Sequence, residues 1–326
     1  MFSIKRLLKP LTVIAIAALP VVGWFQRWNI YDAWRLHGYT PPAQVVELAT
    51  QTTMNDNSRR LFYVYHPELE ERQAFNEHCR TSERTIVLGC YVSFKGIYIY
   101  NVTDERLYGV TQVTAAHELL HAAYGRLSPS EKGRVNGLLN DAFAKVTDQR
   151  IRDTIEDYRK NGADTNNELH SILGTEVRIL PPALEKYYSK FFANRGVVVG
   201  YSEKYVQAFE QRKAQADSYK QQMNAVQAQL KDLKVSIDQQ EAALSQERNA
   251  LEADRRSADT PEEVQAFNAR VASYNNKVRT YQASITKFNT LVATFNDLVN
   301  KYNAIAVEES ELIKALDSRP TTIEKQ

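Results

Sequence analysis

The C-terminal part of the chain carries a heptad pattern that restricts it to long, paired helices. Apolar residues recur at alternating spacings of three and four over residues 219–251, and a second run, with Phe or Tyr at every seventh position, covers residues 267–302. Two such runs joined by a tight connection are typical of an antiparallel helical hairpin. We therefore predict a long α-helical coiled-coil hairpin over residues 201–318, followed by a tail at 319–326.

The two runs are separated by a helix start. Thr260, Pro261 and Glu263 supply a capping residue, a proline in the first turn and the glutamate of a capping box. The aromatic stripe of the second run has two interpretations, either the seam of the hairpin or a surface that binds a partner helix. On the second interpretation the coiled coil binds a protein partner or associates with itself.

The preceding part of the chain has the composition of a turn-rich globular domain. All twelve glycines lie at or before Gly200 and all six histidines at or before His170. With 43% hydrophobic residues the chain can form a sizeable core. The formal net charge of +2 gives no indication of a nucleic-acid partner. We assign residues 29–200 to this domain.

The N-terminus has the pattern of a membrane signal. Three basic residues precede an apolar run over residues 11–25, and aromatic residues gather at its far end. We predict a signal anchor, a transmembrane helix at residues 1–28, with the N-terminus in the cytoplasm and the remainder extracytoplasmic, in a single-pass protein of the cell membrane. The alternative is a signal peptide, with residues 1–23 cleaved and the protein secreted.

Cys79 and Cys90 are the only cysteines, and no C-x2-C metal pattern is present. They can close a small loop as a disulfide bond or remain as two buried thiols. An extracytoplasmic location favours the disulfide.

Strands and helices alternate in the first half of the predicted domain. The aromatic and β-branched composition of residues 61–65 predicts a strand, residues 68–79 a short helix, and residues 85–94 and 96–102 two further strands. Ser128 and Glu131 then mark the start of a helix with a capping box.

Residues 110–124 contain the most informative motif, in which His117, Glu118 and His121 spell H-E-x-x-H. On a helix, the two histidines lie on one face and can bind one Zn²⁺ ion, while Glu118 is placed to act as general base. No proline or glycine interrupts the segment, and its alanines and leucines suit a buried helix. A core helix with two hydrogen-bonded histidines is the structural alternative.

A catalytic zinc site needs a third protein ligand, and Glu168, His170 and Glu176 are the candidates. Thr165 and Glu168 also have the spacing of a capping box, which is a structural role. Glu176 lies on an apolar stripe, where a carboxylate is costly unless it is paired or bound to a metal. The two glutamates would lie about 12 Å apart along a helix, so they cannot bind the same ion. His170 could instead donate a hydrogen bond to an oxyanion.

Residues 85–195 resemble the gluzincin branch of the zincin metallopeptidases, in which H-E-x-x-H is followed on a later helix by a glutamate ligand. Asn167-Glu-Leu-His-Ser171 is similar to the recurrent N-E-x-[aromatic or His]-[small] pattern of that family, which implies that Glu168 is the third ligand. The resemblance also implies that an edge strand of the sheet binds an extended substrate, and we expect this strand at residues 97–102. A second resemblance, to uncharacterised membrane-anchored bacterial H-E-x-x-H proteins, implies no activity.

The sequence thus predicts an α+β zincin-like catalytic domain with an N-terminal transmembrane helix and a C-terminal coiled-coil hairpin. We expect a membrane-anchored, extracytoplasmic zinc endopeptidase that hydrolyses a peptide or protein substrate. Zn²⁺ would be held by His117, His121 and Glu168, with Glu176 as the alternative ligand; Glu118 would be the base and His170 a second candidate catalytic residue. The rival function is a catalytically inactive zincin-like scaffold whose coiled coil binds a partner protein.

Overall fold

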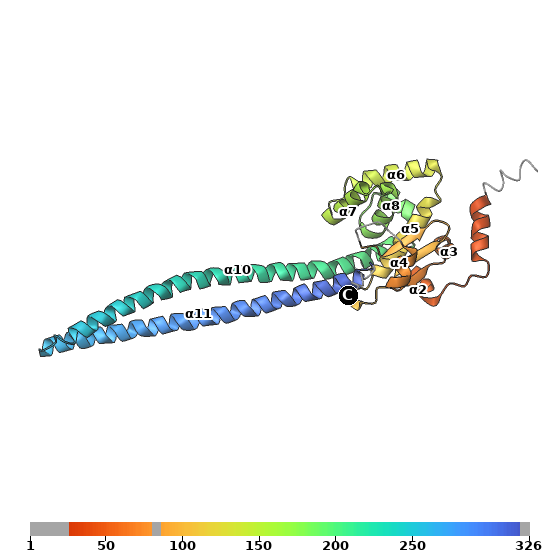
Figure 1. Ribbon diagram of the computed structural model, residues 1–326. Coiled ribbons are helices and arrows are strands. Elements are labelled where there is room, and N and C mark those ends of the chain that lie inside the picture. Colours follow the sequence, from red (N-terminus) through yellow and green to blue (C-terminus); the bar gives the residue numbers. More distant parts are fainter. Residues whose placement is uncertain (1–25, 80–85, 320–326) are drawn as a thin grey trace, which may run out of the picture. The chain divides into compact units, whose positions relative to one another are not determined.

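The computed structural model describes residues 26–79 and 86–319, which are mostly helical (Figure 1). Residues 26–36 form a helical segment. The elements that follow are α2 (Ala43–Gln51), α3 (Asp56–Val64), β1 (Glu68–Glu70), α4 (Arg72–His78), β2 (Gly89–Val92), β3 (Gly96–Tyr100), the 3-10 turn Glu105–Leu107, α5 (Val110–Gly125), α6 (Pro129–Phe143), α7 (Gln149–Lys160), α8 (Thr165–Glu176), α9 (Pro182–Tyr188), α10 (Arg195–Asp254) and α11 (Pro261–Leu316).

The chain divides into two compact units. One consists of the residues up to Ala208 together with those from Leu312, and the other of Phe209–Glu311. The first unit contains the H-E-x-x-H motif, and the second contains most of the heptad pattern.

In the part of the first unit that the structure describes, the sheet has three short strands in the order β1-β3-β2. β3 lies in the centre, parallel to β1 and antiparallel to β2. All five residues of β3 are buried, whereas those of β2 are half-buried. β2 therefore forms an edge of the sheet.

α5 lies between the sheet and α8, with α6 and α7 gathered around α8 on the side away from the strands (Figure 1). Ala115, Ala116 and Ala122 of α5 are completely buried, and their small side chains allow neighbouring elements to pack closely against α5. At the C-terminal end of α5, the Arg126 guanidinium donates hydrogen bonds of 2.7 and 3.0 Å to the Asp32 carboxylate. The bidentate pair ties residues 26–36 to α5.

α8 approaches α5 closely at Gly174. A methyl group added there would lie 2.4 Å from Leu120 Cδ1 and 2.8 Å from Tyr188 Cε1, both on completely buried side chains. Past the end of α8, Arg195 donates a hydrogen bond of 2.6 Å to the carbonyl oxygen of Val177 and forms an ion pair with Glu185. Close packing thus holds α8 against α5, while Arg195 ties the C-terminal end of α8 to Glu185 of α9.

Within the second unit, α10 and α11 pair in antiparallel fashion. Gln240 is hydrogen bonded to Ser284 at 3.3 Å, and Arg212 to Glu308 at 3.2 Å. Residues with higher numbers in α10 thus contact residues with lower numbers in α11, as expected for antiparallel helices. The predicted aromatic stripe from Phe267 to Phe295 is half-buried, which agrees with a seam, whereas Tyr302 at its end is exposed.

Several local predictions are confirmed. Cys79 and Cys90 form a disulfide bond. The capping box of α6 is present, with Ser128 and Glu131 bonded to each other's main-chain N–H groups. α11 begins at Pro261, as predicted.

The predicted α+β fold class is wrong in its balance, because helices dominate and the sheet is small. Residues 61–65, predicted as a strand, lie almost entirely in α3, whose start is stabilised by the Asn55 side chain accepting a hydrogen bond from the Ser58 N–H. The predicted helix at 68–79 begins with β1 instead. Because β1 covers the outer side of β3, the edge strand expected at residues 97–102 is in fact the central strand.

The predicted transmembrane anchor is contradicted. Among residues 26–79 and 86–319, no helix is both long enough and apolar enough to cross a membrane. Residues 1–25 of the predicted segment at 1–28 lie outside the described residues. Trp28, expected in an interfacial belt, stacks on Phe94 with ring centroids 6.2 Å apart and packs against the Arg126 guanidinium. The predicted anchor and the single-pass membrane location therefore have no support in the described part of the chain.

Candidate metal site

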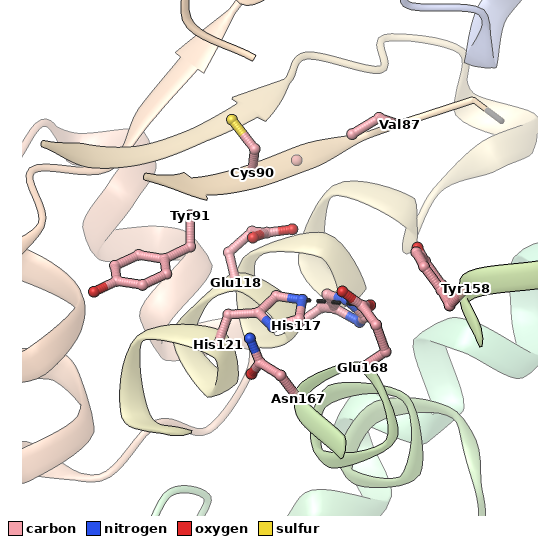
Figure 2. A pocket seen from close by; sticks show the side chains of 10 residues that line it. Val87, Cys90, Tyr91, His117, Glu118, His121, Tyr158, Asn167 and Glu168 are labelled. Carbon is pink, nitrogen blue, oxygen red and sulfur yellow. Dashed lines mark ion pairs between the residues drawn. The ribbon is translucent and has the colours of Figure 1, made fainter. Parts of the chain in front are cut away.

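His117, Glu118 and His121 extend from the middle of α5, whose backbone places the histidines one turn apart. The possible ligand atoms of the three side chains lie within 4.8 Å of one another. His117 and His121 turn toward α8, while Glu118 turns toward β2 (Figure 2). Glu118 thus lies next to the histidines on α5 but faces a different neighbouring element.

Glu168 of α8 is the acidic residue that lies opposite the histidines. Its Oε2 atom is 3.8 Å from His117 Nε2 and 3.7 Å from His121 Nε2. The capping role considered for Glu168 is absent, because Asp164 caps α8 and accepts a hydrogen bond of 3.2 Å from the main-chain N–H of Asn167. Glu168 is therefore available for the histidines.

The electrostatic environment keeps Glu168 ionised. Burial raises the pKa of its carboxyl, but the hydrogen bond with His117 and the positive charges that His121 and His117 can carry outweigh burial and leave the pKa below its ordinary value. A carboxylate maintained in this form beside two imidazoles is suited to bind a divalent cation.

Glu176 is directed elsewhere. Its Oε2 atom accepts a hydrogen bond of 2.6 Å from the Arg150 guanidinium of α7. This ion pair accounts for a carboxylate on an apolar stripe without any metal. The structure thus brings Glu168, and not Glu176, to the histidines.

His170, predicted as a second catalytic residue, does not line the cavity beside the motif and is not placed to act in catalysis. It is completely buried, its Nε2 atom shares a hydrogen bond of 2.8 Å with the Tyr187 hydroxyl, and the Tyr188 hydroxyl donates one of 2.7 Å to its carbonyl oxygen. Burial, followed by the charge of His121, lowers the pKa of His170 to about 3. A neutral imidazole packed among tyrosines stabilises the core.

Two sets of three donors are possible, and the positions of the acids distinguish them. His117 and His121 belong to both sets, and either Glu118 or Glu168 completes the group. Donors about 2.0–2.1 Å from a tetrahedral zinc ion lie about 3.3 Å apart, which is within about 0.5 Å of the Glu168 distances. Because Glu118 faces β2, we assign Glu168 as the ligand and leave Glu118 beside it (Figure 2). Two imidazoles and one carboxylate are a donor set that zinc accepts.

A cavity of about 240 Å³ opens beside the motif. Its walls come from β2 and the segment before it, from α5, and from α7 and α8, and its lining residues are Val87, Gly89, Cys90, Tyr91, His117, Glu118, His121, Tyr158, Asn167 and Glu168 (Figure 2). Gly89 is required for the approach of β2 to α5, since a methyl group there would lie 2.8 Å from Glu118 Oε1 and 2.5 Å from Thr114 Cγ2. The strand therefore passes directly over the candidate base.

Six of the lining residues were not predicted as site residues from the sequence, and two of these, Tyr158 and Asn167, lie beside the candidate ligands (Figure 2). Tyr158 extends from α7 beside Glu168, and Asn167 directs its amide toward His121 (Figure 2). The Asn167 side-chain oxygen is buried and has no hydrogen-bond partner among the described residues. Only the Asn-Glu dipeptide of the family-like pattern could have pointed to Asn167, and no local pattern distinguishes Tyr158 from the other 17 tyrosines of the chain.

Comparison with known proteins gives no relative, because no protein family, curated protein or solved structure matches this chain.

Proposed function

We propose that the chain is a zinc-dependent peptidase whose active centre lies between α5, α8 and β2. The observation that carries the proposal is the position of Glu168, whose Oε2 atom lies 3.7–3.8 Å from the Nε2 atoms of both histidines. Glu118, on α5 with the histidines, faces β2 (Figure 2). This arrangement separates three ligands from one base and leaves an open cavity beside them. A purely structural zinc site would instead require a fourth protein ligand.

In this proposal His117, His121 and Glu168 hold the ion. When bound, zinc supplies a Lewis acid that polarises a substrate carbonyl and makes water acidic near neutral pH. Glu118 accepts a proton from the attacking water as the water oxygen bonds to the carbonyl carbon of the substrate. Glu118 then returns that proton to the leaving nitrogen as the C–N bond breaks, so that hydrolysis consumes one water and leaves the base unchanged.

The cavity also contains a candidate donor for the oxyanion that forms during the attack. Tyr91 points its ring away from the histidines (Figure 2) and packs it edge-on against Tyr65, with ring centroids 4.9 Å apart. Burial, together with the hydroxyl of Tyr65, raises the pKa of Tyr91. Tyr158 extends into the space between Glu168 and the strand (Figure 2). We assign Tyr158 as the hydrogen-bond donor to the oxyanion.

The open edge of β2 favours an extended polypeptide as the substrate. Among the strands of residues 26–79 and 86–319, only β3 pairs with β2, and β2 lines the cavity. A peptide that adds to this edge gains main-chain hydrogen bonds irrespective of the peptide's sequence. Because β2 has a glycine at position 89, the main chain of the strand lies close to Glu118. This mode of binding favours peptides over small, compact substrates.

The test is the Glu118→Gln variant of the full chain, compared with wild type on a library of unstructured peptides. Wild type should bind zinc and cleave, whereas Glu118→Gln should retain zinc and lose cleavage, because the amide keeps the shape of the side chain and cannot accept the proton. Glu156→Gln, on the exposed side of α7, serves as the matched control and should cleave normally. If zinc-loaded wild type cleaves nothing, or if Glu118→Gln remains fully active, the peptidase proposal is refuted. Either result would favour the rival function, a catalytically inactive scaffold whose coiled coil binds a partner protein.

A further inference from the structure

The main-chain groups of β2 and of the segment before it alternate between β3 and the cavity side. The Tyr100 N–H donates a hydrogen bond of 2.8 Å to the Leu88 carbonyl oxygen, and Cys90 lies opposite Tyr98 in the antiparallel register. Positions 88 and 90 therefore bond toward β3, and the alternation of an antiparallel ladder turns positions 87, 89 and 91 to the free edge. These three positions are where an added peptide strand would bond.

One of the three positions is already occupied by the chain itself. The Ser318 hydroxyl, just past the end of α11, donates a hydrogen bond of 2.5 Å to the Val87 carbonyl oxygen. Ser318 is only 3% exposed, and its own carbonyl oxygen accepts a hydrogen bond of 2.5 Å from the Asn76 side chain of α4. Residues 317–319 thus block the Val87 end of the edge.

The blocking segment is firmly held. Leu312, one turn before the end of α11, is completely buried, and the Arg72 guanidinium of α4 donates a hydrogen bond of 3.3 Å to the Lys314 carbonyl oxygen in the last turn of α11. α4, which holds Ser318 through Asn76, is joined to β2 by the disulfide bond between Cys79 and Cys90. The strand and the segment that blocks it are therefore anchored to the same short helix.

The distance between Glu118, the candidate base, and Ser318 limits the length of substrate that fits on this side of the scissile bond. Gly89 is the β2 residue that lies against Glu118, so the bond to be hydrolysed is placed beside Gly89. Val87 lies two positions before Gly89, which corresponds to about 7 Å of extended chain. A substrate strand running in that direction meets Ser318 after about two residues.

We infer that the segment around Ser318 determines substrate length, so that the proposed peptidase accepts only about two residues beyond the scissile bond on the Val87 side. The inference rests on the proposed function and adds to it a substrate class, namely peptides cleaved close to one end. On the Tyr91 side the substrate chain continues without this limit.

The test uses the full chain and nested peptides, built around one cleaved sequence and lengthened by one residue at a time on either side. For wild type, kcat/KM should rise up to about two residues on one side and then fall about tenfold or more, while additions on the other side should be tolerated. The end of the peptide at which the limit occurs reports the direction in which the substrate binds.

Two variants test the role of the segment directly. Ser318→Ala, and a chain that ends at Asp317, should increase the ratio of long-peptide to short-peptide cleavage about tenfold without loss on the short peptide. Ser189→Ala, whose hydroxyl bonds to the Lys186 carbonyl oxygen at 2.9 Å, is the control and should keep the wild-type profile. Equal cleavage of all lengths on both sides by wild type would overturn this inference alone, even if the variants fail to fold. Absence of any cleavage would overturn it together with the proposed function.

Discussion

The close approach of α8 to α5 at Gly174 leads to a prediction that links packing to metal binding. In a Gly174→Ala variant the new methyl group would lie 2.4 Å from Leu120 Cδ1. Two carbon atoms in contact lie about 3.8 Å apart, so one side must retreat by about 1.4 Å. Leu120 and Tyr188, the two neighbours, are completely buried, so they can retreat only if the core around them repacks.

The displacement should therefore be taken up in part by α8, which carries Glu168. A shift of about 1 Å at the third ligand exceeds the tolerance of about 0.2 Å in zinc coordination. We expect Gly174→Ala to lower the free energy of unfolding by about 1–3 kcal/mol, the usual cost of overpacking, and to weaken zinc binding about tenfold or more.

Gly137→Ala is the matched control, because it makes the same substitution inside α6, where a methyl group meets nothing within 4 Å. There the helix should gain about 0.5–1 kcal/mol from the better propensity of alanine, with no change in zinc affinity. Chemical denaturation and calorimetric zinc titration of both variants give the comparison. If Gly174→Ala were as stable as Gly137→Ala and bound zinc as wild type does, the account of how α8 positions Glu168 would be refuted.

Three further outcomes follow from the structure. Tyr158→Phe should lower kcat about 100-fold with unchanged zinc content and little change in KM, whereas Tyr91→Phe should stay near wild type; equal losses in steady-state assays would contradict the role of Tyr158. Replacing both Cys79 and Cys90 by serine should lower the free energy of unfolding by about 3 kcal/mol in urea titrations, and an unchanged midpoint would contradict a stabilising disulfide. For His170, whose pKa falls to about 3 in the folded chain, the unfolded state takes up the proton first as the pH falls below about 6.5. Stability should therefore decline from about pH 6 to pH 4 by up to about 1.4 kcal/mol per unit, and a His170→Gln variant should lose this part of the decline in denaturation curves at several pH values.

Features with strong local rules were predictable from the sequence. α5 is an uninterrupted run of helix-forming residues, α6 has a capping box at Ser128, and α11 starts at Pro261; each is specified by neighbours within a few residues. The sequence alone did not decide between a disulfide bond and two free thiols, because the bond depends on the distance between the end of α4 and β2.

The errors arose where tertiary contacts decide between alternatives. The aromatic residues 61–65 have a strand-like composition, yet the helix signal just before them, the Asn55 cap with Asp56 in the first turn, determines the structure. Similarly, Asp164 rather than Thr165 caps α8, which removes the structural explanation for Glu168. An acidic residue immediately before the predicted start was the signal that could have been weighed.

The third ligand was the least predictable part of the site. Glu168 and Glu176 lie on one helix, and the choice between them depends on Arg150, which belongs to α7 and pairs with Glu176. The position of Ser318 against Val87 involves an even longer separation in sequence, 231 residues, and no local pattern reports it. Such contacts follow from the packing of whole elements rather than from short-range preferences.

Zinc binding by three matched proteins tests the central claim most directly: wild type, Glu168→Gln and Glu176→Gln, each stripped of metal and titrated in a calorimeter, with elemental analysis of the purified chains. The account predicts about one zinc ion per chain in wild type and in Glu176→Gln, and at least about tenfold weaker binding in Glu168→Gln. A wild-type chain without stoichiometric zinc, or a loss of zinc in Glu176→Gln but not in Glu168→Gln, would contradict it.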